Sequence, residues 1–181
     1  MRVIDITHAL NEKTAIYEGD PRFSREIWRT VEEDGYCISK LRMGSHTGTH
    51  VDAPGHFIEG GRSIAELPVH RFVGECLVAG SVDEPLDGCP RLLLKGDAGR
   101  ITLEQAQELI EKGVRLIGTE KLSIGGDEVH RLLLGAECVV LEYLKLDKVA
   151  PGRYLLSAAP LKIDADGSPI RACLIEGELK G

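Results

Sequence analysis

The stretch HTGTHVDAPGHF, residues 46–57, holds three of the six histidines of the chain together with an aspartate. These residues are His46, His50, His56 and Asp52, and all four fall on even positions. Imidazole and carboxylate groups together suit zinc or manganese, and a carboxylate can bridge two ions. The alternative is a set of surface or core histidines in a loop rich in glycine and proline. Because two histidines and an aspartate surround a glycine, the pattern favours a metal site.

The spacing of these residues predicts a bent strand rather than a helix. A helix would place Asp52 about 240° around its axis from His46, and Pro54 would end it. An extended chain puts the even positions on one face but holds His46 and His50 about 13 Å apart. The donor atoms of two ligands of one zinc ion lie within about 3.5 Å of each other, so if these residues share a metal ion the chain must curl between them. Gly48 permits this bend because glycine tolerates a positive φ.

His56 stands apart from the other three residues, because Pro54 and Gly55 separate it from Asp52. We expect His56 to lie beside the metal without binding it. A neutral imidazole next to a metal-bound water could move protons near pH 7. The alternative is that His56 only forms a hydrogen bond with one of the ligands.

The run HTGTHVDAPGHF resembles the signature of the cyclase-like metal-dependent hydrolases, a family that includes the bacterial kynurenine formamidases. The motif of that family is histidine-x-glycine-threonine-histidine-x-aspartate-x-proline-x-histidine, and every fixed position is present here. The segments IDITHAL and IYEGDP and the C-terminal half from His130 onwards are similar to the family as well. The resemblance therefore extends over most of the chain.

The resemblance implies a centre with two divalent ions, usually zinc and in some members manganese. In that scheme His46, His50 and Asp52 hold one ion, Asp52 bridges, and His130 and Glu142 hold the other. Taken without the resemblance, Glu142 would be an exposed strand position and His130 a solvated helix residue. The resemblance makes both of them metal ligands.

The resemblance also implies a reaction, the hydrolysis of a small amide by metal-bound hydroxide with His56 as the proton shuttle. The expected substrate is N-formylkynurenine, which would give kynurenine and formate in tryptophan catabolism. The middle segments GDAGRIT and GTEKLSIGGDEVH depart from the kynurenine formamidase pattern. Hydrolysis of a cyclic amide or lactone, as in the isatin hydrolases, is therefore one alternative. A metal-stabilised binding domain without turnover is the other.

The composition limits the partners of the protein. A formal net charge of −7 with no clustered basic segment argues against nucleic acid. No apolar run reaches the length of a membrane span, and the N-terminus lacks the apolar stretch of a signal peptide. The five cysteines contain no CxxC pair, so we expect buried, reduced thiols in a cytoplasmic protein. We expect a small-molecule substrate, and the resemblance adds a homodimer or homotetramer.

The elements that position the site are predicted to be mostly strands within a single domain, residues 1–181. Apolar or alternating segments recur between turn-forming clusters: RVIDI, FSREIWRTV, YCISKLRM, FVGECLVAGSV, RLLLK, GVRLIG, ECVVLEYL, RYLLSAA and IRACLIEG. Many strands with few helices indicate an α/β or α+β domain with a mixed sheet. The resemblance implies a swivelling β/β/α domain.

Two helices are predicted by their caps and apolar spacing. One begins after Thr102, with Gln105 as its capping-box partner, and ends at Gly113. A shorter one runs from Asp127 to Leu134, with Asp127 as its cap. A further helical turn is expected to start at Ser63.

Overall fold

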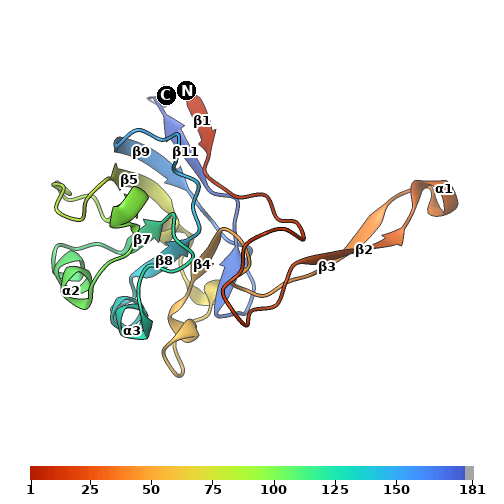
Figure 1. Ribbon diagram of the computed structural model, residues 1–181, viewed down its shortest axis with the longest axis horizontal. Coiled ribbons are helices and arrows are strands. Elements are labelled where there is room, and N and C mark those ends of the chain that lie inside the picture. The colour runs from red at the N-terminus through yellow and green to blue at the C-terminus, as the bar shows by residue number, and fades with distance from the viewer. Residues whose placement is uncertain (178–181) are drawn as a thin grey trace.

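The computed structural model describes residues 1–177 and shows a body from which a hairpin arm projects (Figure 1). The body contains a nine-stranded mixed sheet with the order β1-β11-β9-β5-β6-β7-β8-β4-β10. Its strands are β1 (Arg2–Asp5), β4 (His50–Asp52), β5 (Val73–Ala79), β6 (Arg91–Leu94), β7 (Leu116–Thr119), β8 (Val139–Glu142), β9 (Gly152–Ser157), β10 (Gly167–Pro169) and β11 (Cys173–Glu176). The expected mixed α/β class is confirmed.

The middle of the sheet is parallel and its flanks are antiparallel. Strands β5, β6, β7 and β8 run parallel to one another, whereas β4 and β10 on one side and β9, β11 and β1 on the other pair antiparallel. The two longer helices, α2 (Leu103–Glu111) and α3 (Asp127–Gly135), are the crossovers from β6 to β7 and from β7 to β8. Both helices cover the same face of the sheet (Figure 1).

The two faces of the sheet carry separate apolar clusters, and β8 shows how they alternate. Val139 and Leu141 belong to the cluster on the face away from the helices, whereas Val140 packs with Leu133 of α3. Successive strand residues point to opposite faces, so Glu142 follows Val140 toward the helix side. The strand thus carries one carboxylate to the edge of the helix-covered core.

Both predicted helices are present, and their ends lie within two residues of those expected. The Thr102 hydroxyl accepts from the Gln105 backbone N–H, and the Gln105 side chain accepts in return from Thr102. The cap of α3 is Gly126, so the assignment of Asp127 as cap is wrong. Asp127 is already helical, and its carboxylate lies in the first turn, where the helix dipole favours negative charge. The turn expected at Ser63 is a short 3₁₀ helix.

Four 3₁₀ turns complete the body. They are η1 (Pro54–His56), η2 (Ile64–Glu66), η3 (Val69–Arg71) and η4 (Gly96–Gly99). Within residues 1–177, no helix is both long enough and apolar enough to cross a membrane.

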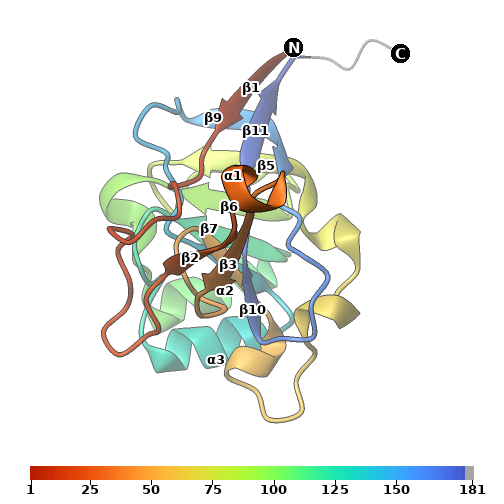
Figure 2. The same ribbon diagram turned by 90° about the vertical axis from the view of Figure 1, so that its right-hand side faces the viewer.

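The arm is a separate two-stranded sheet of β2 (Ser24–Arg29) and β3 (Ile38–Arg42), with the short helix α1 (Val31–Asp34) at its tip. It extends away from the body in Figure 1 and points toward the viewer in Figure 2. Large apolar side chains on the arm are exposed: Ile27, Trp28, Val31, Tyr36, Ile38 and Leu41. Having no core of its own, the arm leaves these side chains uncovered.

All five cysteines are free, as expected, but they are not all buried. Cys76, Cys89 and Cys138 are buried and Cys173 is half-buried, whereas Cys37 is exposed. The prediction of a buried thiol is wrong for Cys37 because this residue lies on the arm.

Candidate metal centre

The predicted bend of the histidine-rich segment is present. Strand β4 begins at His50, and Gly48 just before it has a φ of +71°. A Cβ atom at this position would also lie 2.5 Å from Leu10 Cδ2, so a larger residue would have to displace that side chain, and the positive φ favours glycine. The bend carries His46 back over the strand, where its Nδ1 atom lies 2.8 Å from Asp52 Oδ1.

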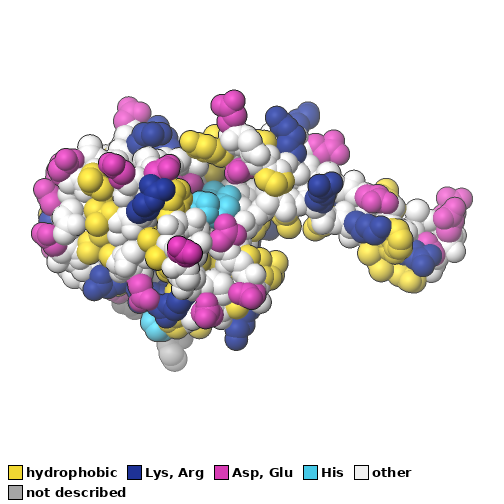
Figure 3. All heavy atoms as spheres, turned by 90° about the horizontal axis from the view of Figure 1, so that it is seen from below, with side chains coloured by type: hydrophobic (Ala, Val, Ile, Leu, Met, Phe, Trp, Pro, Cys, Tyr) yellow, Lys and Arg dark blue, Asp and Glu magenta, His cyan; other side chains and the backbone are white. Residues whose placement is uncertain are grey.

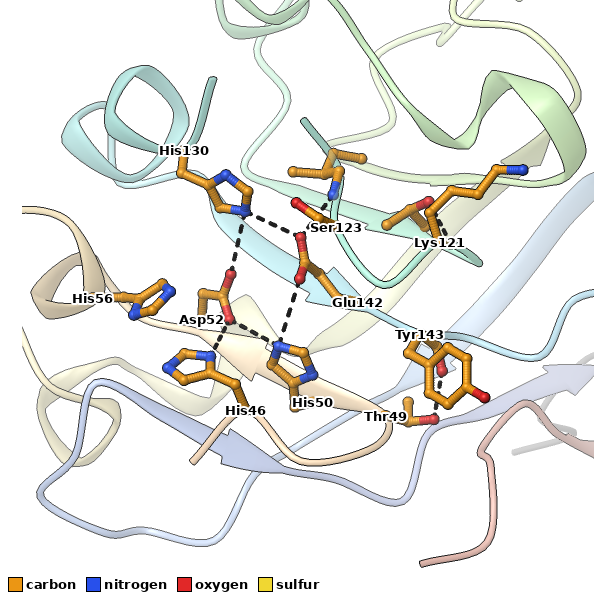
Figure 4. A network of polar contacts seen from close by, with 12 residues as sticks. His46, Thr49, His50, Asp52, His56, Lys121, Ser123, His130, Glu142 and Tyr143 are labelled. Atoms are coloured by element: carbon orange, nitrogen blue, oxygen red, sulfur yellow. Dashed lines mark hydrogen bonds and ion pairs between the residues drawn. The ribbon is translucent and has the colours of Figure 1, made fainter. Parts of the chain in front are cut away.

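The five predicted ligands come together from three elements (Figure 4). Sheet register puts His50 of β4 directly opposite Glu142 of β8, and Asp52 follows two residues later on the same face. Helix α3, which covers this face, contributes His130. The sequence segments that supply these side chains are about eighty residues apart, and strand pairing joins them.

The donor atoms divide into two groups, and each group contains one oxygen of both carboxylates. In the first group Asp52 Oδ1 lies 2.8 Å from His46 Nδ1 and 3.2 Å from His50 Nε2. Glu142 Oε2 lies 3.6 Å from the same His50 atom. In the second group His130 Nε2 lies 3.1 Å from Glu142 Oε1 and 3.9 Å from Asp52 Oδ2. Asp52 and Glu142 therefore both face the two groups.

The other ring nitrogen of each ligand histidine is held by an oxygen outside the cluster. His50 Nδ1 donates to the Gly48 carbonyl at 2.8 Å, and His130 Nδ1 donates to the Gly126 carbonyl at 3.1 Å. His46 Nε2 lies 2.9 Å from Asp166 Oδ2. Such hydrogen bonds fix the tautomer, so the nitrogen that faces the cluster keeps its lone pair for a metal ion.

The cluster is buried and negatively charged. Glu142 and His130 are each only 5% exposed, so the expectations from the residues alone, an exposed strand position and a solvated helix residue, are wrong. Helix α3 packs against β8, and its own His130 lies at hydrogen-bond distance from Glu142 at the end of that strand. Burial disfavours the charge of Asp52, but hydrogen bonds from His46 and His50 hold the pKa of this carboxyl well below its usual range.

Both carboxylates favour positive charge on the neighbouring histidine rings. Burial opposes protonation of His46, yet the hydrogen bonds to Asp52 and Asp166 outweigh it and raise the pKa of His46 to about 9. Burial also opposes protonation of His50 and His130. The contact with Asp52 nevertheless raises the pKa of His50, and the contact with Glu142 raises the pKa of His130. When a metal ion binds, its positive charge would take the place of the protons that the carboxylates favour on these rings.

His56 borders the first donor group. It ends the turn η1, and its ring centroid lies 3.8 Å from that of His46. Burial lowers the pKa of His56, which favours the neutral ring at neutral pH. One atom each of His46, Asp52 and His56 lie within 4.8 Å of one another. Figure 4 shows the His56 ring beside the cluster with no polar contact to the five ligands. Its role as a shuttle stays a prediction.

Asp166 belongs to the site although its sequence context predicted only a turn. Its Oδ2 atom lies 2.9 Å from His46 Nε2 and 3.2 Å from His56 Nδ1. Burial opposes its charge, but the hydrogen bond with His46 outweighs burial and lowers the pKa of Asp166 to about 2. The stretch DADGSP carries no signal that would separate this aspartate from an ordinary turn residue.

A cavity of about 260 Å³ opens onto the cluster. The histidines form its floor, and in Figure 3 they are visible in a hollow of the surface. Its rim comes from other segments: Tyr17, Asp20, Arg100, Leu122, Ser123 and Asp127. A small ligand can therefore reach the donor atoms from solvent.

Known proteins are similar to this chain in sequence and in fold. Residues 4–91 match the model of a family described as putative cyclase. The chain is 36% identical to the kynurenine formamidase of Bacillus cytotoxicus over 94% of its own length and 96% of that protein. It is 35% identical to the kynurenine formamidase of Bacillus cereus with the same coverage.

Solved structures agree with these relatives. A protein described as a predicted metal-dependent hydrolase from Bacillus stearothermophilus is 28% identical, with a TM-score of 0.78 over 96% of this chain and 97% of that one. Isatin hydrolase A from Labrenzia aggregata is 25% identical, with a TM-score of 0.78 over 97% and 94% of the two chains. The identity to the formamidases, the fold and the clustered histidines and carboxylates together show that the chain belongs to the cyclase family of metal-dependent hydrolases.

Proposed function

We propose that this protein is a metal-dependent arylformamidase that hydrolyses N-formylkynurenine to kynurenine and formate. The observation that carries the proposal is the pair of carboxylates, Asp52 and Glu142, which both face the two groups of histidine donors. The identity to kynurenine formamidases along 94% of the chain supports the choice of substrate.

The donor set fits two divalent ions. His46, His50, Asp52 and Glu142 would hold one, and His130 would hold the other together with the remaining carboxylate oxygens. These nitrogen and oxygen donors accept zinc and manganese alike. When bound, such ions lower the pKa of water and polarise a carbonyl group.

His56 is placed to move the proton of the reaction. Its Nδ1–H donates to Asp166, so its Nε2 carries the lone pair that can accept a proton from the attacking water. The water oxygen bonds to the formyl carbon, the carbon–nitrogen bond breaks, and His56 returns the proton to the departing arylamine nitrogen. At the rim, Arg100, Asp20 and Asp127 offer charges complementary to the amino-acid end of the substrate.

Turnover of N-formylkynurenine by zinc- or manganese-loaded protein tests the proposal, with chelated protein as the reference. We expect chelator-sensitive turnover with a kcat/KM of about 10⁴ M⁻¹s⁻¹ or more. His56→Ala should keep the bound metal and lose roughly 10²–10⁴-fold in kcat. His70→Ala, at an exposed histidine on η3, should behave as wild type. Metal-loaded protein without turnover of this substrate would refute the formamidase assignment.

Isatin is the second candidate substrate, because isatin hydrolase A shares the fold along nearly the whole chain. The same assay with isatin distinguishes the two substrates. A higher kcat/KM for opening of the isatin ring than for hydrolysis of N-formylkynurenine would show that the protein acts on cyclic amides. If metal-loaded protein turned over neither substrate nor any lactone offered, the binding-domain alternative would stand.

We also propose that the arm joins the protein to a second copy of itself. An isolated two-stranded hairpin is marginally stable in water, yet this arm exposes apolar side chains on both faces, such as Ile27 on one and Trp28 on the other. A groove lined by Met43, Leu161 and Ile170 lies at the root of the arm. In a two-fold pair, each arm can pack into the groove beside the root of the other.

The mass in solution tests this assembly. Wild-type protein should sediment as a dimer or a multiple of it, and Ile27→Glu together with Leu41→Glu should shift it toward monomer. Val69→Glu places the same charge at an exposed apolar position on the body and should leave the mass unchanged. A monomeric wild type at micromolar concentration would overturn the proposal.

A further inference from the structure

Asp166 is fixed in place by the backbone around it. It directly precedes β10, whose Gly167 lies opposite Asp52 of β4 in the sheet register. The Ala53 N–H donates to the Asp166 carbonyl at 2.9 Å, and the Ile64 N–H donates to the carbonyl of the preceding residue, also at 2.9 Å. Strand pairing thus sets Asp166 directly across from the histidine-rich segment.

The residue after Asp166 leaves room for the His46 ring. A Cβ atom on Gly167 would lie 2.6 Å from His46 Cε1 and 3.0 Å from both ring nitrogens. The ring cannot move away easily, because its nitrogens contact Asp52 on one side and Asp166 on the other. The dipeptide 166–167 therefore forms a cradle for His46.

One oxygen of Asp166 serves two histidines with different expected roles. Oδ2 accepts from His46 Nε2 and from His56 Nδ1, so in the neutral form of each ring the opposite nitrogen carries the lone pair. For His46 this is Nδ1, which faces Asp52. For His56 it is Nε2. A carboxylate that accepts from one nitrogen of a histidine fixes both the tautomer and the orientation of the ring.

We propose that Asp166 is a positioning residue that sets the tautomers of His46 and His56 through one shared carboxylate oxygen, and so couples metal binding to proton transfer. The role given to His56 rests on the proposed function, whereas the effect on the two rings does not. No other side chain among residues 1–177 contacts both histidines at hydrogen-bond distance from one atom.

If Asp166 couples the two rings, its removal should lower both metal affinity and kcat. Without Asp166, His46 loses the acceptor that keeps the ring proton on Nε2 and thereby leaves Nδ1 free for a metal ion. Metal affinity should then fall about 10- to 100-fold. The His56 ring loses the partner of Nδ1–H at the same time, so its proton can move to Nε2 and block the acceptor. kcat should then fall with little change in KM.

The test compares Asp166→Ala and Asp166→Asn with Asp164→Ala, which removes an exposed carboxylate two residues away. Zinc affinity is measured by competition with a chelator, and the ring tautomers by ¹⁵N-histidine NMR of the zinc-loaded protein, with His56→Gln to assign the signals. We expect Asp166→Ala to lower zinc affinity and abolish the Nδ1–H tautomer of His56. Asp166→Asn, whose amide oxygen still accepts, should show smaller effects, and Asp164→Ala none.

Neither of these measurements needs a substrate, so failure of the formamidase assignment would leave them intact. If Asp166→Ala kept both the zinc affinity and the His56 tautomer of wild type, the proposal would be overturned. The same conclusion would follow if Asp164→Ala and Asp166→Ala reduced zinc affinity equally. Should Asp166→Ala not fold, Asp166→Asn decides by the same two readouts.

Discussion

If His46 is a metal ligand, as proposed, binding of a divalent ion must displace a proton from its ring. In the ion-free protein, burial opposes protonation of this ring, but hydrogen bonds with Asp52 and Asp166 prevail and raise the pKa of His46 to about 9. Metal ions bind neutral imidazole, so the proton competes with the ion. At pH 7, about two pH units below this pKa, roughly one molecule in a hundred has a neutral His46. The competition therefore weakens binding at pH 7 by about 100-fold, or about 2.7 kcal/mol.

The sign of the pH effect follows from this raised pKa. Zinc affinity should rise about tenfold per pH unit from pH 7 and level off near pH 9. In the ion-free protein the same proton stabilises the folded state. That contribution is complete below about pH 6.5 and is lost as the pH rises through about 9. The free energy of unfolding of chelated protein should therefore fall by up to about 3 kcal/mol over this range.

Chelator competition between pH 6.5 and 8.5, corrected for protonation of the chelator, measures the slope of affinity. Calorimetry in buffers of different ionisation enthalpy counts the protons, and we expect about one or more to be released at pH 7. His70→Ala, which changes an exposed histidine outside the cavity, should leave both results unchanged. An affinity that is flat or falling with pH, or binding without proton release, would refute the argument.

Three further outcomes test the fold and the centre. Gly118→Ala should lower the free energy of unfolding by about 1–3 kcal/mol in urea titrations, because its Cβ would lie 2.5 Å from Leu93 Cδ2. Gly135→Ala, whose Cβ would make an ordinary 3.7 Å contact, should leave it unchanged or raise it by up to ~1 kcal/mol. Thr102→Ala should cost about 1 kcal/mol by removing the cap of α2. Chelation should abolish turnover yet leave the far-ultraviolet circular dichroism unchanged, and loss of that signal would indicate a structural metal instead.

Much of the fold could be predicted because long elements carry local signals. The capping box at Thr102 and the apolar runs of β5, β8 and β11 are properties of neighbouring residues. Strand β10, with the residues Gly, Ser and Pro, carries no such signal, and β4 was indicated only by the spacing of its histidine and aspartate. Pairing with neighbouring strands, which the sequence does not display, makes them strands.

The arm shows a different limit of prediction. Its two segments, FSREIWRTV and YCISKLRM, were expected to be strands, and this is confirmed. Alternation of side chains does not reveal whether a hairpin joins the main sheet or leaves it. The exposed state of Cys37 follows from that placement and from nothing in its neighbours.

Some features of the candidate site could likewise be predicted from the sequence, and others could not. The spacing around Gly48 was sufficient to predict a bend between His46 and His50, because an extended chain would hold these two residues too far apart to share a metal ion. The burial of Glu142 and the contact of Asp166 with two rings depend on strand register and on helix packing over the sheet. Both features arise from tertiary structure. The role of Glu142 was predicted only through the family resemblance, and the contact of Asp166 with the two rings was not predicted.

The floor and the rim of the cavity come from different parts of the chain, and this separation bears on how such enzymes can diversify. The side chains proposed to bind ions lie on β4, β8, α3 and the bend before β4, next to the two apolar clusters of the sheet. Tyr17, Arg100 and Leu122 at the rim lie on connections between elements. Substitutions in these connections can therefore alter which carbonyl compound is admitted without disturbing the apparatus that attacks it. An engineer who wished to redirect this scaffold to another amide or lactone would begin with those loops and leave the sheet untouched.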